Sequence, residues 1–440
     1  MLTYLINVTG DLLAVSLIIG IIFSFIDHYC GERGQLIVRI GLILGLVSAA
    51  IRAYITNTRR LVGGWRVGAY GYAIALVLFI ILIVALVIFS KNYFRHASDE
   101  TGAKKSLLAE TVISVLTGLL LASYLYVALP NVYVYPFKFD TGGNGFLSTE
   151  YLFRLGGYLL GILICVLGAV AAYKIASVAA KKGHQKLLSA AFFASNIMYA
   201  VYNFARLMLV LTPRKIVDSA ALFNFAAASN NYAHWYTYAV FFVLIIMSVV
   251  ILIRSYTAKE PYATNAEHRK QRALWRSGKR YSVLMLFCFV CAILCSTLFV
   301  KLNTVVIREA PVEDPIVIKD GSGADYELRV PLEMVEDGHL HRFGYTTDEG
   351  IPVRFIVILK QEGTTNYGIG LDACEICGEA GYYENNDGQV VCKKCGVVMN
   401  TTTIGMKGGC NPIIIDYDIN EDYIMVPVSE MIKNQSRFKK

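Results

Sequence analysis

Four cysteines near the C-terminus form the pattern in this chain that is best suited to chemistry. Cys374 and Cys377 are separated by two residues, and Cys392 and Cys395 repeat this spacing after fourteen intervening residues. Two such pairs can place four thiolates on facing turns. Soft thiolates in a tetrahedral set bind Zn²⁺ or an iron–sulfur centre rather than Mg²⁺ or Ca²⁺. A glycine follows each pair and tolerates the positive φ of such a turn. The spacing therefore predicts one metal site built by these four cysteines.

Long apolar segments make up most of the chain before this motif. The composition is 55% hydrophobic and 17% charged, with a mean hydropathy of +0.50, which is typical of membrane proteins. Eight apolar runs have the ~20 residues needed to cross a ~30 Å hydrocarbon core. The runs are Thr3–Ile26, Gln35–Ile55, Ala69–Ser90, Leu107–Leu129, Tyr151–Lys174, Leu187–Leu211, Trp235–Ile253 and Tyr281–Leu302. Residues 1–302 are thus predicted to form an α-helical polytopic domain of about eight transmembrane helices in a lipid bilayer. The first run lacks a basic leader and a cleavage site, and is predicted to be retained.

Basic residues between the runs predict the orientation of the chain. Seventeen Lys and Arg residues fall after the first, third, fifth and seventh runs, against six in the other connections. The positive-inside rule places the richer set in the cytoplasm, so both ends of an eight-span chain lie outside. The net charge of +8 reflects this bias and gives no reason to expect a nucleic-acid partner.

The last part of the chain has a different pattern. Residues 303–325 are charged, contain Gly and Pro, and are predicted to be a linker. Residues 326–440 are predicted to form a small β-rich extracytoplasmic domain, because short alternating runs of β-branched and aromatic residues indicate strands. These runs are Tyr326–Leu332, Val353–Leu359, Ile413–Ile419 and Tyr423–Val428. Asn386-Asp-Gly388 lies between the two Cys pairs and predicts a hairpin turn. The four-cysteine site is then expected to resemble a zinc ribbon.

Three further residues are candidate ligands near this site. Cys410 can replace one of the four cysteines, support the site from outside, or pack apart from it as a small apolar side chain or a disulfide partner. His339 and His341 are two residues apart, so on a strand they project from the same face and can bind a second metal such as iron or copper through neutral imidazole. The alternative for both is an ordinary surface histidine.

Polar and sulfur-containing residues also occur in the apolar runs. Charged side chains are costly in hydrocarbon, and several gather toward the outer ends of the predicted helices, which indicates a polar vestibule. Snorkelling to the interface is the alternative. The residues are Asp11, Arg52, Arg154 and Arg206, with Glu150 and His234 at the same level. The cysteines of this part are predicted to pack as small apolar side chains. They are Cys30, Cys165, Cys288, Cys291 and Cys295.

Five motifs carry a resemblance to a known family. They are His339-Leu-His341-Arg-Phe, Leu371-Asp-Ala-Cys374-Glu-Ile-Cys377-Gly, Gly381-Tyr-Tyr, Cys392-Lys-Lys-Cys395-Gly and Gly408-Gly-Cys410-Asn-Pro. Over about Val330–Asp416 the chain resembles the FtrD-like family of membrane proteins, described as iron–sulfur containing and linked to bacterial high-affinity iron uptake. The resemblance implies a protein of the bacterial cytoplasmic membrane that handles electrons. Its implied partners are an iron permease and an extracytoplasmic iron- or copper-binding protein.

The identity of the metal and the function both have alternatives. Cysteine spacing alone favours structural zinc, the resemblance favours iron–sulfur, and copper or disulfides are further possibilities outside the membrane. The sequence contains no nucleotide-binding loop, Gly-x-Ser-x-Gly elbow or HExxH motif, so it gives no sign of an ATPase or a hydrolase. The expected function is support of iron uptake by electron transfer. The alternatives are a permease or permease-assembly subunit with a structural zinc domain, and an extracytoplasmic metal or redox sensor.

Overall fold

The structure, a computed structural model, divides the chain into two compact units. Met1–Val210 and Tyr232–Asn303 form the first, which we call the membrane unit, and Leu211–Asn231 and Thr304–Lys440 form the second, which we call the metal unit. The described residues are 2–58, 65–93, 107–139, 148–214, 216–257, 264–300, 311–319, 326–360, 366–385, 388–399, 401–405 and 410–438.

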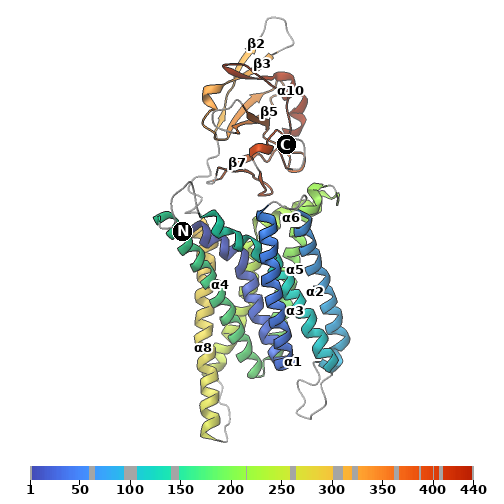
Figure 1. Cartoon of the computed structure of the whole chain (residues 1–440), viewed down its shortest axis with the longest axis vertical. Coiled ribbons are helices and arrows are strands. Elements are labelled where there is room, and N and C mark those ends of the chain that lie inside the picture. The colour runs from blue at the N-terminus through green and yellow to red at the C-terminus, as the bar shows by residue number, and fades with distance from the viewer. Residues whose placement is uncertain are drawn as a thin grey trace. The chain divides into compact units, whose positions relative to one another are not determined.

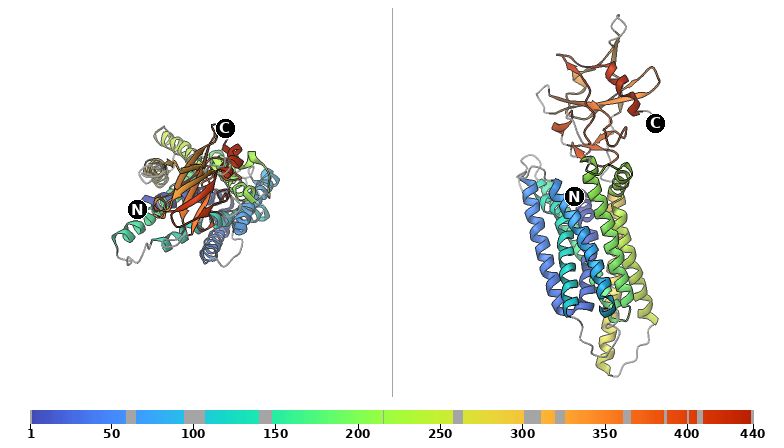
Figure 2. Two further views of the ribbon diagram at one scale, coloured as in Figure 1. Left: turned by 90° about the horizontal axis from the view of Figure 1, so that it is seen from above. Right: turned by 90° about the vertical axis from the view of Figure 1, so that its right-hand side faces the viewer.

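The membrane unit is a bundle of helices that run side by side (Figures 1 and 2). Seven helices in the described part of the chain are long and apolar enough to cross a membrane, which agrees with a multi-pass membrane protein. They are α1 (Leu2–Asn57), α2 (Trp65–Tyr93), α3 (Leu107–Val134), α4 (Thr149–Lys181), α5 (Gln185–Leu211), α7 (His234–Thr257) and α8 (Asn265–Ile293). The 3₁₀ turn η1 (Tyr135–Lys138) follows α3, and the π-helical turn η3 (Leu294–Leu298) continues α8.

Helix α1 accounts for the difference between eight predicted spans and seven helices. It has 56 residues, or ~84 Å at ~1.5 Å per residue, far more than one bilayer crossing needs. Gly31 has non-helical backbone angles of φ 66° and ψ −158°, a conformation open mainly to glycine. The segments before and after Gly31 correspond to the first two predicted runs. The prediction of eight crossings therefore corresponds to counting α1 twice.

Small residues let the helices of this unit approach closely. A Cβ atom built on Gly41 of α1 would lie 2.3 Å from the carbonyl oxygen of Gly118 on α3. On the same helix, a Cβ on Gly20 would lie 2.4 Å from the carbonyl oxygen of Ala169 on α4. Apolar side chains in a bilayer gain little from leaving lipid, so helix association depends on such backbone proximity and close packing. These glycines explain why α3 and α4 both pack against α1.

Helix α8 begins before its apolar part. Its N-cap is Thr264, whose hydroxyl accepts a hydrogen bond from the Glu267 amide at 3.2 Å, and an acidic residue three positions after the cap is typical of a helix start. The basic residues from Arg269 to Arg280, predicted to lie in a connection, are therefore on a helix. The Lys/Arg bias and the orientation derived from it are unaffected by this change.

The orientation can be tested with single reporter cysteines. The ten native cysteines lie in the described residues, and nine of them are buried, so background labelling of the parent protein should be low. Asp348→Cys, at an exposed turn of the metal unit, should react in intact cells with a membrane-impermeant maleimide. Lys270→Cys on α8 should react only after lysis, since the positive-inside rule keeps that segment in the cytoplasm. The reverse pattern would place the metal unit in the cytoplasm.

Three small sheets build the metal unit (Figure 1). One sheet has the order β1-β4-β5-β6, the second β10-β11-β3-β2, and the third β7-β8-β9. The strands are β1 (Val312–Glu313), β2 (Ile316–Lys319), β3 (Tyr326–Pro331), β4 (His341–Thr346), β5 (Pro352–Leu359), β6 (Tyr367–Leu371), β7 (Tyr382–Glu384), β8 (Val390–Cys392), β9 (Val398–Met399), β10 (Asp418–Ile419) and β11 (Tyr423–Pro427). Helix α6 (Ala220–Asn231) also belongs to this unit, and helix α10 (Val428–Asn434) follows β11.

The two four-stranded sheets share one apolar core. Alternate residues of β5, from Val353 to Leu359, enter it, as do Leu328 and Val330 of β3 and Met431 of α10. This is the period of two that side chains follow along a strand. The strand predictions for β3, β5 and β11 are confirmed. The run Ile413–Ile419 is a strand only at Asp418–Ile419.

The domain boundaries differ from the predicted ones in two places. Part of the segment predicted as a linker forms strands, because Ile316–Lys319 pairs with β3 and Val312–Glu313 pairs with β4. In addition, Leu211–Asn231, between α5 and α7 in the chain, belongs to the metal unit. No local sequence pattern indicates that Leu211–Asn231 belongs to the metal unit, because its contacts are with residues more than 160 positions later.

Candidate metal centre

The first Cys pair lies on a tight turn after β6. The Cys374 amide donates to the Gly378 carbonyl at 3.1 Å, and the Gly378 amide donates back at 3.0 Å. Within this turn the Cys377 amide points at the Cys374 sulfur, at 3.0 Å. Gly378 has φ +69°, so the positive φ predicted from the sequence is confirmed. Amide donors aimed at sulfur favour the thiolate form that binds metals.

The second pair repeats this arrangement at the end of a hairpin. Cys392 closes β8, its amide donates to the Val397 carbonyl at 3.1 Å, and the Gly396 amide donates to the Cys392 carbonyl at 2.9 Å. Gly396 has φ +67°. Strands β7 and β8 pair antiparallel with Tyr382 opposite Cys392, which confirms the predicted hairpin. Asn386 and Asp387 of its turn lie outside the described residues.

Cys410 joins the four cysteines in one buried thiol cluster. The sulfurs of Cys395 and Cys410 are 3.7 Å apart. Two groups of three have all their sulfurs within 4.8 Å of one another, and Cys377 belongs to both. One group adds Cys374 and Cys392 to Cys377, and the other adds Cys395 and Cys410. We call these five residues the thiol cluster.

The thiol cluster matches the size of a single metal coordination sphere. A tetrahedral metal with metal–sulfur bonds of ~2.3 Å has its sulfurs ~3.8 Å apart, close to the Cys395–Cys410 separation. Five thiols offer one more ligand than a tetrahedral site takes. A cluster that contains inorganic sulfide holds its thiolates farther apart than one shared ion does, so the same residues would have to spread to bind it. Thiolate ligands suit zinc, a single iron ion and an iron–sulfur cluster alike, and the cluster requires the wider spacing.

Hydrogen bonds between the thiols divide them into two kinds. Bonds from Cys377 lower the pKa of Cys374 and of Cys395 below the ordinary thiol range. Bonds to Cys374 raise the pKa of the other three thiols, Cys377, Cys392 and Cys410. Metal binding must displace the remaining protons, so the affinity of the site should increase with pH.

A buried ion-pair network supports the first turn. Asp372 is 1% exposed, and its Oδ2 lies 3.0 Å from Nε of Arg342 and 3.2 Å from Nε of Arg354. Its Oδ1 accepts the Tyr382 amide at 2.8 Å. Burial raises the pKa of the Asp372 carboxyl, and Arg342 opposes this shift. Because Asp372 is two residues from Cys374 and also holds β7, it fixes the turn relative to the hairpin.

Sequence reasoning assigned no role to these residues, although a signal existed. Arg342 and Asp372 both lie inside motifs that carry the family resemblance, as does Tyr382. The Tyr382 hydroxyl donates to the Cys410 carbonyl at 2.8 Å, so this buried side chain joins the hairpin to the fifth thiol. Gly408 and Gly409, which precede Cys410, lie outside the described residues.

Helix α6 and the turn before it supply contacts to the second Cys turn. The Asn230 side-chain amide donates to the Cys395 carbonyl at 3.3 Å, and that of Asn231 donates to the Lys394 carbonyl at 2.9 Å. The Arg214 guanidinium interacts electrostatically with Cys410, while burial lowers the pKa of Arg214. A segment remote in sequence thus binds the backbone of the second Cys turn.

The two candidate histidines contact carboxylates. His339 lies on a bend before β4, so it does not share a strand face with His341, and its Nδ1 is 2.9 Å from Oε1 of Glu384. Nε2 of His341 is 2.8 Å from Oδ1 of Asp337. Although burial raises it, the pKa of Asp337 is held below its ordinary value by the His341 hydrogen bond. Neither histidine belongs to the groups that contain the thiols, and their role as ligands stays a prediction.

The predicted polar vestibule separates into distinct contacts. Asp11 interacts with Arg206, and its Oδ2 accepts the Tyr135 hydroxyl at 2.7 Å. Arg52 instead donates to the Tyr126 carbonyl at 2.8 Å. Arg154 donates to the Lys138 carbonyl at 3.5 Å. The side chain of Glu150 lies outside the described part, and His234 lines a cavity of the membrane unit.

The cysteines of the membrane unit pack in its interior. Four of them, Cys30, Cys165, Cys288 and Cys295, are buried, and Cys291 is partly buried. Among the described residues none of the five belongs to a group of three possible metal ligands. This agrees with their predicted packing as small apolar side chains.

Comparisons with known proteins give one match. No curated protein and no solved structure matches the chain. All five thiols, Asp372 and the two arginines that pair with it lie between residues 335 and 438. Residues 335–438 match the family described as membrane iron-sulfur containing protein FtrD-like.

Proposed function

We propose that this protein supports iron uptake by electron transfer through an iron–sulfur centre held by its thiol cluster. The observation that carries the proposal is the burial of five converging thiols in a unit attached to a multi-pass membrane bundle. The description of the matched family as iron–sulfur containing favours iron over zinc. The proposed location is a bacterial cytoplasmic membrane, with the metal unit outside.

The residues around the cluster are suited to hold a redox centre. When bound, the centre would accept the electron released as Fe²⁺ becomes Fe³⁺. Amides of the two Cys turns stabilise negative charge on sulfur, and hydrogen bonds to sulfur are one of the factors that set the potential of such a centre. The Arg214 guanidinium interacts electrostatically with Cys410. The proposed partners are an iron permease that takes Fe³⁺ and an extracytoplasmic iron- or copper-binding protein.

The test is metal analysis with spectroscopy on protein purified without oxygen. An iron–sulfur centre should give stoichiometric iron, visible absorption that bleaches with dithionite, and an EPR signal in one redox state. Acid-labile sulfide separates a sulfide-bridged cluster from a single iron. Zn²⁺ is d¹⁰ and has no redox change. Stoichiometric zinc with no iron and no spectral change would refute the electron-transfer function.

A permease, or a permease subunit, is the second candidate, and one feature of the membrane unit favours it. Asn203 of α5 is fully buried, and among the described residues neither atom of its amide has a hydrogen-bond partner. It lies one turn before Arg206, which interacts with Asp11. Buried polar groups without partners often mark the place of water or a ligand, and ionisable groups inside a membrane usually serve function. A zinc-only result would make this the leading candidate.

A further inference from the structure

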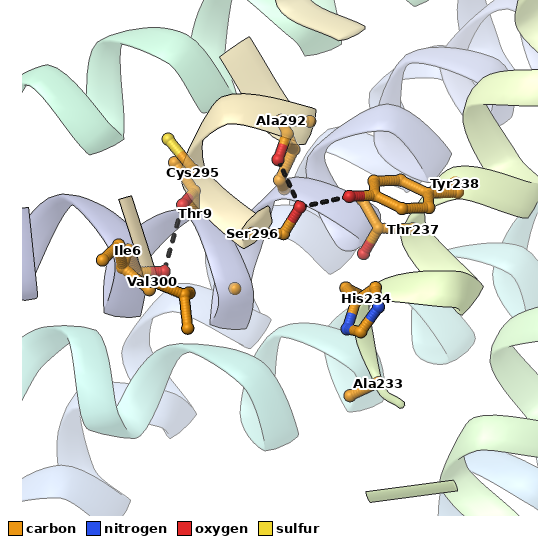
Figure 3. A pocket seen from close by; sticks show the side chains of 12 residues that line it. Ile6, Thr9, Ala233, His234, Thr237, Tyr238, Ala292, Cys295, Ser296 and Val300 are labelled. Atoms are coloured by element: carbon orange, nitrogen blue, oxygen red, sulfur yellow. Dashed lines mark hydrogen bonds between the residues drawn. The ribbon is translucent and has the colours of Figure 1, made fainter. Parts of the chain in front are cut away.

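A cavity of about 180 Å³ lies inside the membrane unit, and nothing in the proposed function uses it. Its walls come from three places (Figure 3): α1, the first turns of α7, and the end of α8 with η3. Each of these helices is long and apolar enough to cross a membrane. A molecule dissolved in the lipid phase is therefore the natural candidate to occupy it.

The backbone around the cavity is shaped to leave space. Gly10 of α1 lines it, and a Cβ atom built on Gly10 would meet no atom of the described residues within 4 Å. Two further lining residues, Cys295 and Ser296, lie in the π-helical turn η3. Such turns are rare and are found frequently at functional sites. The absence of a side chain at Gly10 and the π-helical turn η3 are thus two independent backbone features at the cavity.

The polar groups at the cavity differ in whether they can still donate a hydrogen bond to a ligand. The Ser296 hydroxyl already donates to the Ala292 carbonyl at 2.7 Å, and it is also hydrogen-bonded to the Tyr238 hydroxyl. By contrast, the His234 imidazole and the Thr237 hydroxyl, one turn apart on α7, form no hydrogen bond with another described residue. Figure 3 shows both side chains on the same wall. They are donors available to a ligand.

These features specify the chemistry of the ligand. The described residues that line the cavity include no Asp, Glu, Lys or Arg, and the rest of this wall is largely apolar, with Ile6, Leu13 and Val300. A charged ligand would lose its hydration without compensation there. The volume suits one ring and its substituents. The fitting ligand is a neutral, lipid-soluble ring with a carbonyl oxygen that accepts from His234 and Thr237.

We propose that this cavity binds the headgroup of an isoprenoid quinone. The carbonyl oxygen of the quinone accepts from the His234 imidazole and the Thr237 hydroxyl, and its ring fills the space beside Gly10. The isoprenoid tail remains in lipid. Binding is a property of the membrane unit alone, so it does not depend on which metal the metal unit holds. A test that finds no quinone binding therefore leaves the electron-transfer function of the metal unit untouched, and the reverse also holds.

The full chain contains its own reporter for this site. Trp235 has its ring centroid 5.9 Å from that of His234, and the other two tryptophans, Trp65 and Trp275, can be replaced by phenylalanine. Titration of this protein in lipid nanodiscs with decylubiquinone should quench Trp235 saturably. Gly10→Leu should abolish the saturable part. His234→Phe, which keeps the ring but removes the donor, should raise Kd about two- to tenfold, the usual effect of one hydrogen bond.

The matched control is Gly156→Leu on α4. A Cβ atom at Gly156 also meets no atom of the described residues within 4 Å, but this glycine is not among the residues that line the cavity, so quinone binding should be unchanged. Quenching that never saturates, or that Gly10→Leu leaves intact, would overturn the proposal. Equal competition by decylbenzene, which has a ring and tail but no carbonyl, would identify a site for lipid tails instead.

Discussion

Serine at Cys374, Cys377, Cys392 or Cys395 should reduce the metal content of the purified protein to background. Each residue supplies about a quarter of the ligands of a four-coordinate site, and a serine hydroxyl is a far poorer ligand for a soft metal than a thiolate. The Cys377 sulfur belongs to both groups of three, so Cys377→Ser should show this loss as fully as any of the four variants. The measurement is metal per protein by mass spectrometry on anaerobically purified samples.

Two further cysteines calibrate this series. Cys410→Ser leaves both Cys pairs in place, so it should retain metal but bind it about 10- to 100-fold more weakly. Cys165→Ser, at a buried cysteine of the membrane unit, should leave the metal content unchanged. Full metal content in Cys374→Ser or Cys392→Ser would contradict a single site built by the two pairs.

Removing the carboxylate of Asp372 should have the largest effect on the stability of the metal unit. The Asp372→Ala protein keeps Arg342 buried without its counter-ion and leaves the Tyr382 amide without its acceptor. Breaking a buried ion pair on one side costs about 3–5 kcal/mol of unfolding free energy. Denaturant unfolding of the metal-loaded full chain, followed by the signal of the bound metal, measures this change.

Asp348→Ala provides the control for that measurement, since Asp348 is an exposed aspartate in the same unit. Surface substitutions usually change stability by less than ~0.5 kcal/mol. Equal unfolding midpoints for the two variants would show that the Asp372 network does not hold the first Cys turn in place.

The parts of the site that the sequence could predict depend on short-range chemistry. Cys-x-x-Cys-Gly encodes its own turn, because the glycine position requires positive φ and the sulfurs are held by the same few residues. The hairpin between the pairs was predictable for the same reason, from Asn386-Asp-Gly388 and the apolar residues around it. Apolar length likewise predicts the helices, although the bend at Gly31 decides whether α1 is one element or two.

Other parts depend on contacts that no local pattern contains. Asp372 pairs with Arg342 and Arg354 across two strands, and Asn230 meets Cys395 across a separation of 165 residues. The spacing of His339 and His341 predicts a common face only if both lie on a strand, and β4 begins at His341. In each case tertiary packing, rather than local propensity, determines the position of the side chain.

The discontinuous make-up of the metal unit constrains how this protein can be assembled. Because Leu211–Asn231 and Thr304–Lys440 form one compact body, both must reach the same side of the membrane, and the two helices between them, α7 and α8, cross it an even number of times. The ribosome makes Asn230 long before Cys395, so the second Cys turn gains its partner only after both helices have been inserted. The metal centre can therefore mature only after α7, α8 and the second Cys pair have been translated. A soluble fragment that starts at residue 311 would lack this partner.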